Sequence, residues 1–254
     1  MPFSSRSYVN RYVPSNRFPT GLKWLLISNI SIFVFTYILK ASGTGLFFQN
    51  FALVPSQVVQ TFAVWQVVTY MFLHSVDNFG HILWNMLGLW MFGAEIERLW
   101  GTTKFLRFYF ICGISAAVFV IIAAYLFGFQ DVATIGSSGA VYGVLVAYGV
   151  LFPDRTVLFG FLIPLKSKYF VMIIGGIVLL QSYTATIGGQ RGAAIVVHLG
   201  GLITGFLLLR GRKLRIRVRQ PVARAYKDWK LQRAKKKFEV YLRKQDTKRD
   251  PWVH

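Results

Sequence analysis

The sequence predicts an all-α polytopic membrane protein whose core is a bundle of six transmembrane helices. Its 254 residues are 54% hydrophobic, yet the formal net charge is +20. Residues 210–254 hold +13 of this charge, while the other 209 residues contain only 12 basic and 5 acidic side chains. A soluble protein that binds nucleic acid would spread its positive charge over the whole surface. The observed split instead indicates an apolar membrane domain with a basic tail.

Stretches without Asp, Glu, Lys or Arg locate the helices, because a charge at the centre of the bilayer is energetically costly. Seven long stretches of this kind occur before the tail, and six of them are 16 to 23 residues long. A spanning helix needs about 17 to 25 apolar residues, and fewer where a flanking lysine reaches the interface. We therefore predict six helices, at 22–42, 78–96, 105–128, 137–153, 168–187 and 193–209.

The seventh stretch, Ala41 to Val76, contains glycine, proline, glutamine and asparagine among its aromatic residues. This composition is typical of an interfacial loop with short amphipathic helices, so we assign 41–77 to a loop in the outer leaflet. The first helix is followed by no small-residue cleavage site, which predicts an anchor rather than a removed signal peptide. The predicted parts are a cytoplasmic N-terminal segment (1–21), a transmembrane domain (22–209) and a basic cytoplasmic tail (210–254).

Basic residues gather on the side of the membrane that carries both termini, whereas the opposite side receives only Lys40 and Arg191. The positive-inside rule therefore predicts a multi-pass protein of the cell (inner) membrane with both termini in the cytoplasm. The second, fourth and sixth helices then run from the outside inward, so their N-terminal ends lie near the outer face.

Polar residues in these three helices share one depth. The second helix opens with His81 and Asn85, which a spacing of four places on one face. The fourth opens with Gly136-Ser137-Ser138-Gly139, followed by Tyr142, and the sixth carries His198. At about 1.5 Å per residue, all of them lie within roughly the first two turns of their helices. A nucleophile, its base and its oxyanion donors must converge in this way.

Each of these features also has a purely structural interpretation. A hydrogen bond between helices would explain His81 and Asn85, and a packing role would explain a lone His198. A single G-x-S-G sequence has little specificity for a nucleophile. The only cysteine, Cys112, excludes an internal disulfide and a multi-cysteine metal site, and its apolar surroundings predict an inert packing residue.

Two pairs of glycines link the fourth helix to the sixth. Gly139 and Gly143 on one helix, and Gly201 and Gly205 on the other, each have the four-residue spacing of small residues that lets membrane helices approach closely. We expect this approach to bring Ser138 within reach of the imidazole on the sixth helix.

The chemistry that this layer supports is acyl transfer. Ser138 needs a base, and His198 has a suitable proton affinity. Asn85, His81 and the backbone N–H of Ser138 are candidate donors to the oxyanion, and Tyr142 is a platform against which the imidazole would pack. None of the five acidic residues before the tail falls at this depth, which predicts a Ser-His dyad rather than a triad.

Together these residues resemble the rhomboid intramembrane serine proteases of the bacterial type. The resemblance rests on the serine motif with Tyr142, on His81-xxx-Asn85 and on His198-xx-Gly201-xxx-Gly205. It also includes the stretch from Trp65 to His74 before the second helix and Gly93-xxx-Glu97-xxx-Gly101 at its end, and it covers about residues 20–210. Gln66 is a departure, since many members carry arginine after the tryptophan.

The resemblance implies a six-helix bundle that cleaves transmembrane segments of other proteins near the outer face, without a metal or cofactor. The implied dyad is Ser138 and His198, supported by Tyr142, Gly136 and Gly139. The stretch around Ser182 to Ala193 resembles the cap over the active site. The alternative is a catalytically silent rhomboid-like protein that binds transmembrane helices without cutting them.

The tail 210–254 lies outside this resemblance. Leu231, Ala234 and Phe238 recur there at helical spacing among lysines. A solvated helix that fixes the topology and a helix that binds anionic lipid headgroups are equally consistent with this pattern, and nucleic acid is a weaker third partner.

Overall fold

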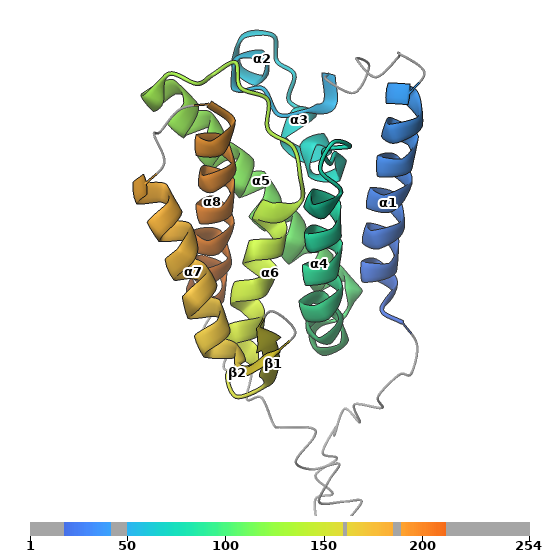
Figure 1. The fold of residues 1–254 in the computed structure, drawn as a ribbon, viewed down its shortest axis with the longest axis vertical. Helices are drawn as coiled ribbons and strands as arrows, with labels where there is room; N and C mark the ends of the chain where they lie inside the picture. Colours follow the sequence, from blue (N-terminus) through green and yellow to red (C-terminus); the bar gives the residue numbers. More distant parts are fainter. Residues whose placement is uncertain (1–17, 42–49, 160–161, 185–188, 212–254) are drawn as a thin grey trace, which may run out of the picture. The chain divides into compact units, whose positions relative to one another are not determined.

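The computed structural model describes residues 18–41, 50–159, 162–184 and 189–211. Within these residues six long helices occur, and they stand side by side in one bundle (Figure 1), which confirms the all-α, six-helix fold class. They are α1 (Thr20–Ala41), α4 (Phe79–Trp100), α5 (Thr102–Phe127), α6 (Ser138–Leu151), α7 (Ser167–Thr184) and α8 (Gly189–Gly211). The predicted N-terminal segment up to residue 17, the tail from residue 212 and the centre of the predicted cap lie outside the described residues.

The exterior of the bundle is suited to lipid rather than to water. Among the described residues, three helices are long and apolar enough to cross a membrane, namely Thr20–Ala41, Thr102–Phe127 and Gly192–Arg210. Two further apolar helices are shorter, Ser138–Leu151 and Ser167–Leu180. α4 is 22 residues long but includes polar residues at both ends. Large apolar side chains such as Leu126 and Met172 are exposed on the outside, as in an integral membrane protein.

The centre of the bundle depends on contacts between the backbones of α6 and α8. A Cβ atom added to Gly201 would lie 2.0 Å from the carbonyl oxygen of Gly139, and one added to Gly205 would lie 2.9 Å from the Cα atom of Gly143. Any larger residue would therefore push the two helices apart. Cys112 of α5 is buried against the same region, where its Sγ would lie 2.5 Å from a Cβ atom at Gly143.

α1 is fastened to the bundle mainly through its N-terminal end. Most of its residues are exposed, and its buried ones are Gly21, Leu22, Leu25 and Asn29. The buried Glu97 carboxylate of α4 accepts hydrogen bonds from the backbone N–H groups of Gly21 and Leu22, both at 2.7 Å. It also accepts one from the Thr102 hydroxyl at 2.6 Å. Glu97 thus supplies acceptors for N–H groups that the first turn of a helix cannot satisfy itself.

Short helices lie in the described part of the connection between α1 and α4. They are α2 (Pro55–Gln60), α3 (Gln66–Thr69) and the 3-10 helix η2 (Tyr70–Phe72). The Gln66 side chain is buried, accepts a hydrogen bond from the Val54 N–H at 2.9 Å and donates one to Gln57 Oε1 at 2.7 Å. The amide therefore anchors the loop at the position where many rhomboids carry arginine.

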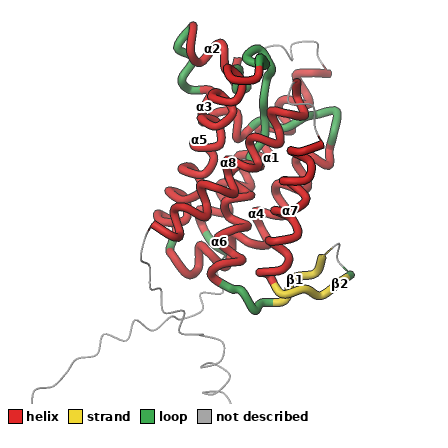
Figure 2. The backbone as a smooth tube through the Cα atoms, turned by 90° about the vertical axis from the view of Figure 1, so that its left-hand side faces the viewer, coloured by secondary structure: helices red, strands yellow, loops and turns green. Residues whose placement is uncertain are grey.

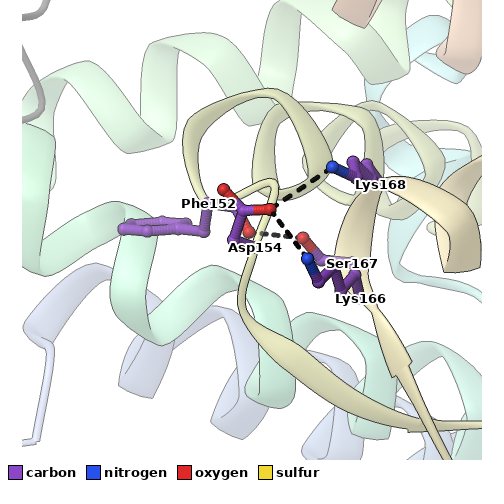
Figure 3. A network of polar contacts seen from close by, with 5 residues as sticks. All are labelled: Phe152, Asp154, Lys166, Ser167 and Lys168. Atoms are coloured by element: carbon purple, nitrogen blue, oxygen red, sulfur yellow. Dashed lines mark hydrogen bonds and ion pairs between the residues drawn. The ribbon is translucent and has the colours of Figure 1, made fainter.

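A two-stranded antiparallel hairpin joins α6 to α7 and was not predicted. Its strands are β1 (Thr156–Phe159) and β2 (Ile163–Lys166), at the end of the bundle opposite to α2 (Figure 2). A search for long apolar spans does not detect such a short element. Ser167 Oγ donates to the Phe152 carbonyl, and Asp154 lies between Lys166 and Lys168 (Figure 3). These contacts hold the hairpin between the ends of α6 and α7.

Replacing Glu97 with alanine should loosen the N-terminal end of α1. The variant leaves two buried N–H groups without an acceptor, so we expect the free energy of unfolding to fall by about 2–4 kcal/mol. Unfolding of the purified protein in a mild detergent measures this loss. Glu95→Ala is the control, because Glu95 lies two residues away on the same helix and its partners, Arg155 at 3.8 Å and the Tyr148 hydroxyl, do not belong to α1. Equal losses in the two variants would contradict this role of Glu97.

Replacing Gly201 with alanine should separate α6 from α8. The added methyl group would overlap the backbone of α6, so we expect the variant to lose about 1–3 kcal/mol of stability. Gly176→Ala is the control, because a Cβ atom there meets nothing within 4 Å. Thermal unfolding of the two variants side by side measures the difference, and a Gly201→Ala variant as stable as its control would show that the contact is not a tight one.

Candidate active site

A cavity of about 700 Å³ lies between α4, α6, α7 and α8. Its lining includes the polar residues of three helices that the sequence predicted to share one layer, together with Asn78 and Thr134 from the loops. His81 and Asn85 belong to α4, Ser138 and Tyr142 to α6, and His198 to α8. Most of the remaining wall is apolar. The structure therefore brings all five of these side chains to one cavity inside the bundle.

The imidazole of His198 stacks on the ring of Tyr142. Their centroids are 4.4 Å apart and their planes differ by 23°. Stacking restricts the plane of the imidazole. Its Nδ1 is buried and has no hydrogen-bond partner in the described part of the chain.

Ser138 is the first residue of α6, and its neighbour Ser137 is the residue that caps the helix. The two serines differ in environment: Ser138 lines the cavity, whereas the Ser137 side chain is fully buried and does not. No hydrogen bond joins Ser138 to His198 in the described residues, although both line the same space. Such bonds are often absent from a free enzyme and form when the substrate is bound.

The segment before Ser138 has a conformation that requires glycine. Gly136 has a φ of +116°, and a Cβ atom added there would lie 2.6 Å from Nε2 of His81. Its N–H donates to the Tyr70 carbonyl at 2.9 Å, and the Tyr70 hydroxyl donates to the Gly113 carbonyl at 2.7 Å. Tyr70 therefore holds the backbone that leads into the serine.

His81 and Asn85 are oriented by their own surroundings. The Ser75 N–H donates to Nδ1 of His81 at 3.4 Å, so the proton of a neutral imidazole is on Nε2, which faces Gly136. Asn85 Nδ2 donates to the His81 carbonyl at 2.8 Å, which leaves its second amide proton available. The N–H groups in the first turn of α6 also lack acceptors within their helix. Hydrogen-bond donors from two helices thus belong to residues that line the same cavity as Ser138.

Sequence analysis did not single out two residues that support this site. His74 is buried, and its ring meets that of His81 edge-on with centroids 5.1 Å apart. Burial lowers the pKa of His74 to about 3, so the ring is neutral at physiological pH. Tyr70 holds Gly136, as described above. Both residues lie in the stretch from Trp65 to His74, and their burial is a tertiary property that the stretch alone does not reveal.

The described lining of the cavity contains no carboxylate. Asp77, at the end of the loop before α4, is exposed and pairs with Lys40 at 2.5 Å. Glu97 is bound to the first turn of α1. Within the described residues there is also no group of three or more His, Cys, Asp or Glu side chains that could hold a metal ion. The available chemistry at this cavity is that of hydroxyl, imidazole and amide groups.

Comparisons with known proteins agree with this arrangement. The sequence model of the Rhomboid domain matches residues 61–212. The chain is 28% identical over 144 residues to the putative rhomboid protease YdcA of Bacillus subtilis, which is 57% of this chain and 65% of that protein. It is 32% identical over 153 residues to the rhomboid protease GlpG of Haemophilus influenzae, 60% of this chain and 72% of that protein.

A mitochondrial relative matches this chain over a smaller share of its own length. The chain is 30% identical over 134 residues to Rhomboid protein 1, mitochondrial, of Saccharomyces cerevisiae, which is 52% of this chain and 38% of that protein. The matched region thus spans less than two thirds of both the yeast protein and YdcA. The domain match nevertheless covers more than half of this chain and includes α4 to α8. The chain belongs to the rhomboid family.

Proposed function

We propose that this protein is an intramembrane serine endopeptidase that cleaves transmembrane segments of other membrane proteins near the outer face. Ser138 is the nucleophile and His198 the base. The observation that carries this proposal is the shared cavity of Ser138, His198 and two amide or imidazole donors inside a membrane bundle. The names of YdcA and GlpG, each called a rhomboid protease, support the same reaction class.

The reaction begins when Ser138 Oγ attacks the scissile carbonyl carbon while Nε2 of His198 takes the hydroxyl proton. The new tetrahedral oxyanion accepts hydrogen bonds from Asn85, His81 and the Ser138 backbone N–H. When the C–N bond breaks, His198 returns the proton to the leaving amine and an acyl-enzyme remains. A water molecule, deprotonated by His198, then attacks the ester and releases the carboxyl product and the free serine.

Tyr142 and the glycines prepare this geometry. Stacking on Tyr142 restricts the His198 ring, so less orientational freedom is lost in the reaction. Gly136 lets the His81 ring approach the serine segment, and Gly139 leaves room for Ala116 of α5 and Val197 of α8 beside Ser138. These are positioning roles, since none of the three residues exchanges a proton or forms a bond.

A substrate helix would reach the cavity between α4 and α7. Trp84 of α4 and Ile174 of α7 both line the cavity, and Trp84 is exposed. The basic residues near both ends of the chain favour an orientation with cytoplasmic termini, which puts the N-terminal ends of α4, α6 and α8 toward the outer face. Cleavage is then expected near the outer end of the substrate helix.

A second function class is a rhomboid-like protein that binds transmembrane helices without cutting them. It requires the same cavity but no reactive serine. The presence of both Ser138 and His198 favours the protease. Cleavage of a single-span substrate distinguishes the two classes.

Ser138→Ala should abolish cleavage. Purified protein reconstituted in vesicles with a single-span model substrate should generate two fragments, and the variant should lose at least about 1000-fold in rate because the nucleophile is gone. Ser137→Ala is the matched control and should retain activity, since Ser137 does not line the cavity. Binding of the intact substrate without fragments in the unmodified protein would favour the second function class, and undiminished cleavage by Ser138→Ala would reject the assigned nucleophile.

Asn85→Ala should lower kcat by roughly 100- to 1000-fold, which is typical for loss of one oxyanion donor. Asn78→Ala is the control, because Asn78 lines the same cavity but lies about 10 Å away along the helix. Steady-state cleavage rates of both variants, together with their unfolding temperatures, separate a catalytic effect from a loss of fold. Full activity in Asn85→Ala would remove this residue from the oxyanion site.

A further inference from the structure

A second cavity of about 530 Å³ opens on the outside of the bundle between α6, α7 and α8. It uses a different face of α7 from the catalytic cavity. Phe170 and Ile174 line the catalytic cavity, whereas Met172, Gly175 and Leu179 line the outer one. Met172 is 70% exposed and Leu179 is 60% exposed. The outer cavity, called the α7/α8 groove here, is therefore accessible from the surrounding lipid.

The α7/α8 groove has the length of one leaflet of a bilayer. On α7 it runs from Lys168 to Leu179, which is about 16 Å along a helix. Half of the hydrocarbon core of a membrane is about 15 Å thick. The groove begins at the end of the bundle that carries the hairpin. Lys168 lies there as the second residue of α7. From that end, its length would reach to about the middle of a bilayer.

The α7/α8 groove is open at Gly175, which has no side chain to fill it. A Cβ atom added to Gly175 would meet nothing within 4 Å. The walls around it include Val171 of α7 and Leu199 and Ile203 of α8, all apolar. A hydrocarbon chain therefore finds apolar contacts along this part of the groove.

The chemistry changes at one end of the groove. Lys168 is the only charged side chain among its described lining residues. Asp154 lies 3.3 Å from the Lys168 ammonium and 3.5 Å from the Lys166 ammonium (Figure 3), and Lys168 holds the pKa of Asp154 below its usual range. Two cations therefore share one ionised carboxylate. The mouth of the groove keeps an excess positive charge at the level of the lipid headgroups.

We propose that the α7/α8 groove binds one acyl chain of an anionic phospholipid whose phosphate lies beside Lys168. The apolar slot, its one-leaflet length and its cationic mouth match the three parts of such a lipid. Non-specific contact with the lipids of the surrounding bilayer would not depend on the charge of Lys168, so it would show no preference for an anionic headgroup. This binding site does not depend on the proposed protease activity.

Photocrosslinking of the full chain in vesicles tests the site. The vesicles contain phosphatidylcholine with a trace of phosphatidylglycerol that carries a diazirine on one acyl chain, or the same amount of phosphatidylcholine with the same labelled chain. Mass spectrometry then locates the crosslinked residues. We expect the anionic lipid to label Leu179, Ile203 and their neighbours roughly fivefold more than the zwitterionic lipid.

Two matched pairs of variants separate this site from general attraction to the membrane surface. Lys168→Gln should remove the preference for the anionic lipid, whereas Lys166→Gln should keep it, because both lysines pair with Asp154 but only Lys168 lines the groove. Gly175→Leu should lower the labelling by both lipids several-fold, whereas Gly176→Leu should not. A Cβ atom added to either glycine would meet nothing within 4 Å, but only Gly175 lines the groove.

Equal labelling of the groove by the two lipids in the unmodified protein would overturn the proposal. An equal loss of preference in Lys166→Gln and Lys168→Gln would also overturn it, since the effect would then come from diffuse positive charge. If Gly175→Leu does not fold, the lysine pair alone decides the outcome.

Discussion

The contact between the backbones of α6 and α8 is the constraint on which the rest of the structure depends. Gly201 lies so close to the Gly139 carbonyl that it cannot carry a side chain without a shift of the helices, and a Cβ atom at Gly139 would lie 2.6 Å from the Cβ atom of Ala116 in α5. His198 lies one turn before Gly201 on α8, and Ser138 lies beside Gly139 on α6. The separation of these two side chains therefore depends on the glycines next to them, and Tyr142 stacks on the imidazole of His198. The packing of α6 against α8 thus also determines the geometry of the candidate site.

Buried polar groups form the second constraint, because the bilayer offers no water to satisfy them. Glu97 accepts the free N–H groups of α1, and Gln66 joins three parts of the loop before α4. Tyr70 accepts the N–H of Gly136 and so links this loop to the segment that leads into Ser138. The loop is thus part of the support of the candidate site rather than a simple connection. Its His74 packs directly against the ring of His81.

The sequence allowed the six helices to be predicted because apolar length and the absence of charge are local properties. It also allowed the layer of His81, Asn85, Ser138 and His198 to be predicted, because helical spacing and chain direction fix depth. The support of that layer could not be predicted in the same way, since the roles of Tyr70 and His74 arise from contacts between segments far apart in the chain. The hairpin β1–β2 was missed because it is short and its apolar residues resemble the ends of neighbouring spans. Roles assigned to Ser138 and His198 remain proposals that rest on their shared cavity.

The central claim is that Ser138 is a nucleophile activated by His198, and covalent labelling tests it most directly. The protein in vesicles is treated with a fluorophosphonate, which reacts with activated serines, and the modified residue is identified by mass spectrometry. The structure predicts a single adduct on Ser138, with none on the adjacent Ser137, and loss of that adduct in His198→Ala. An adduct on Ser137, or undiminished labelling of Ser138 in His198→Ala, would contradict the assignment.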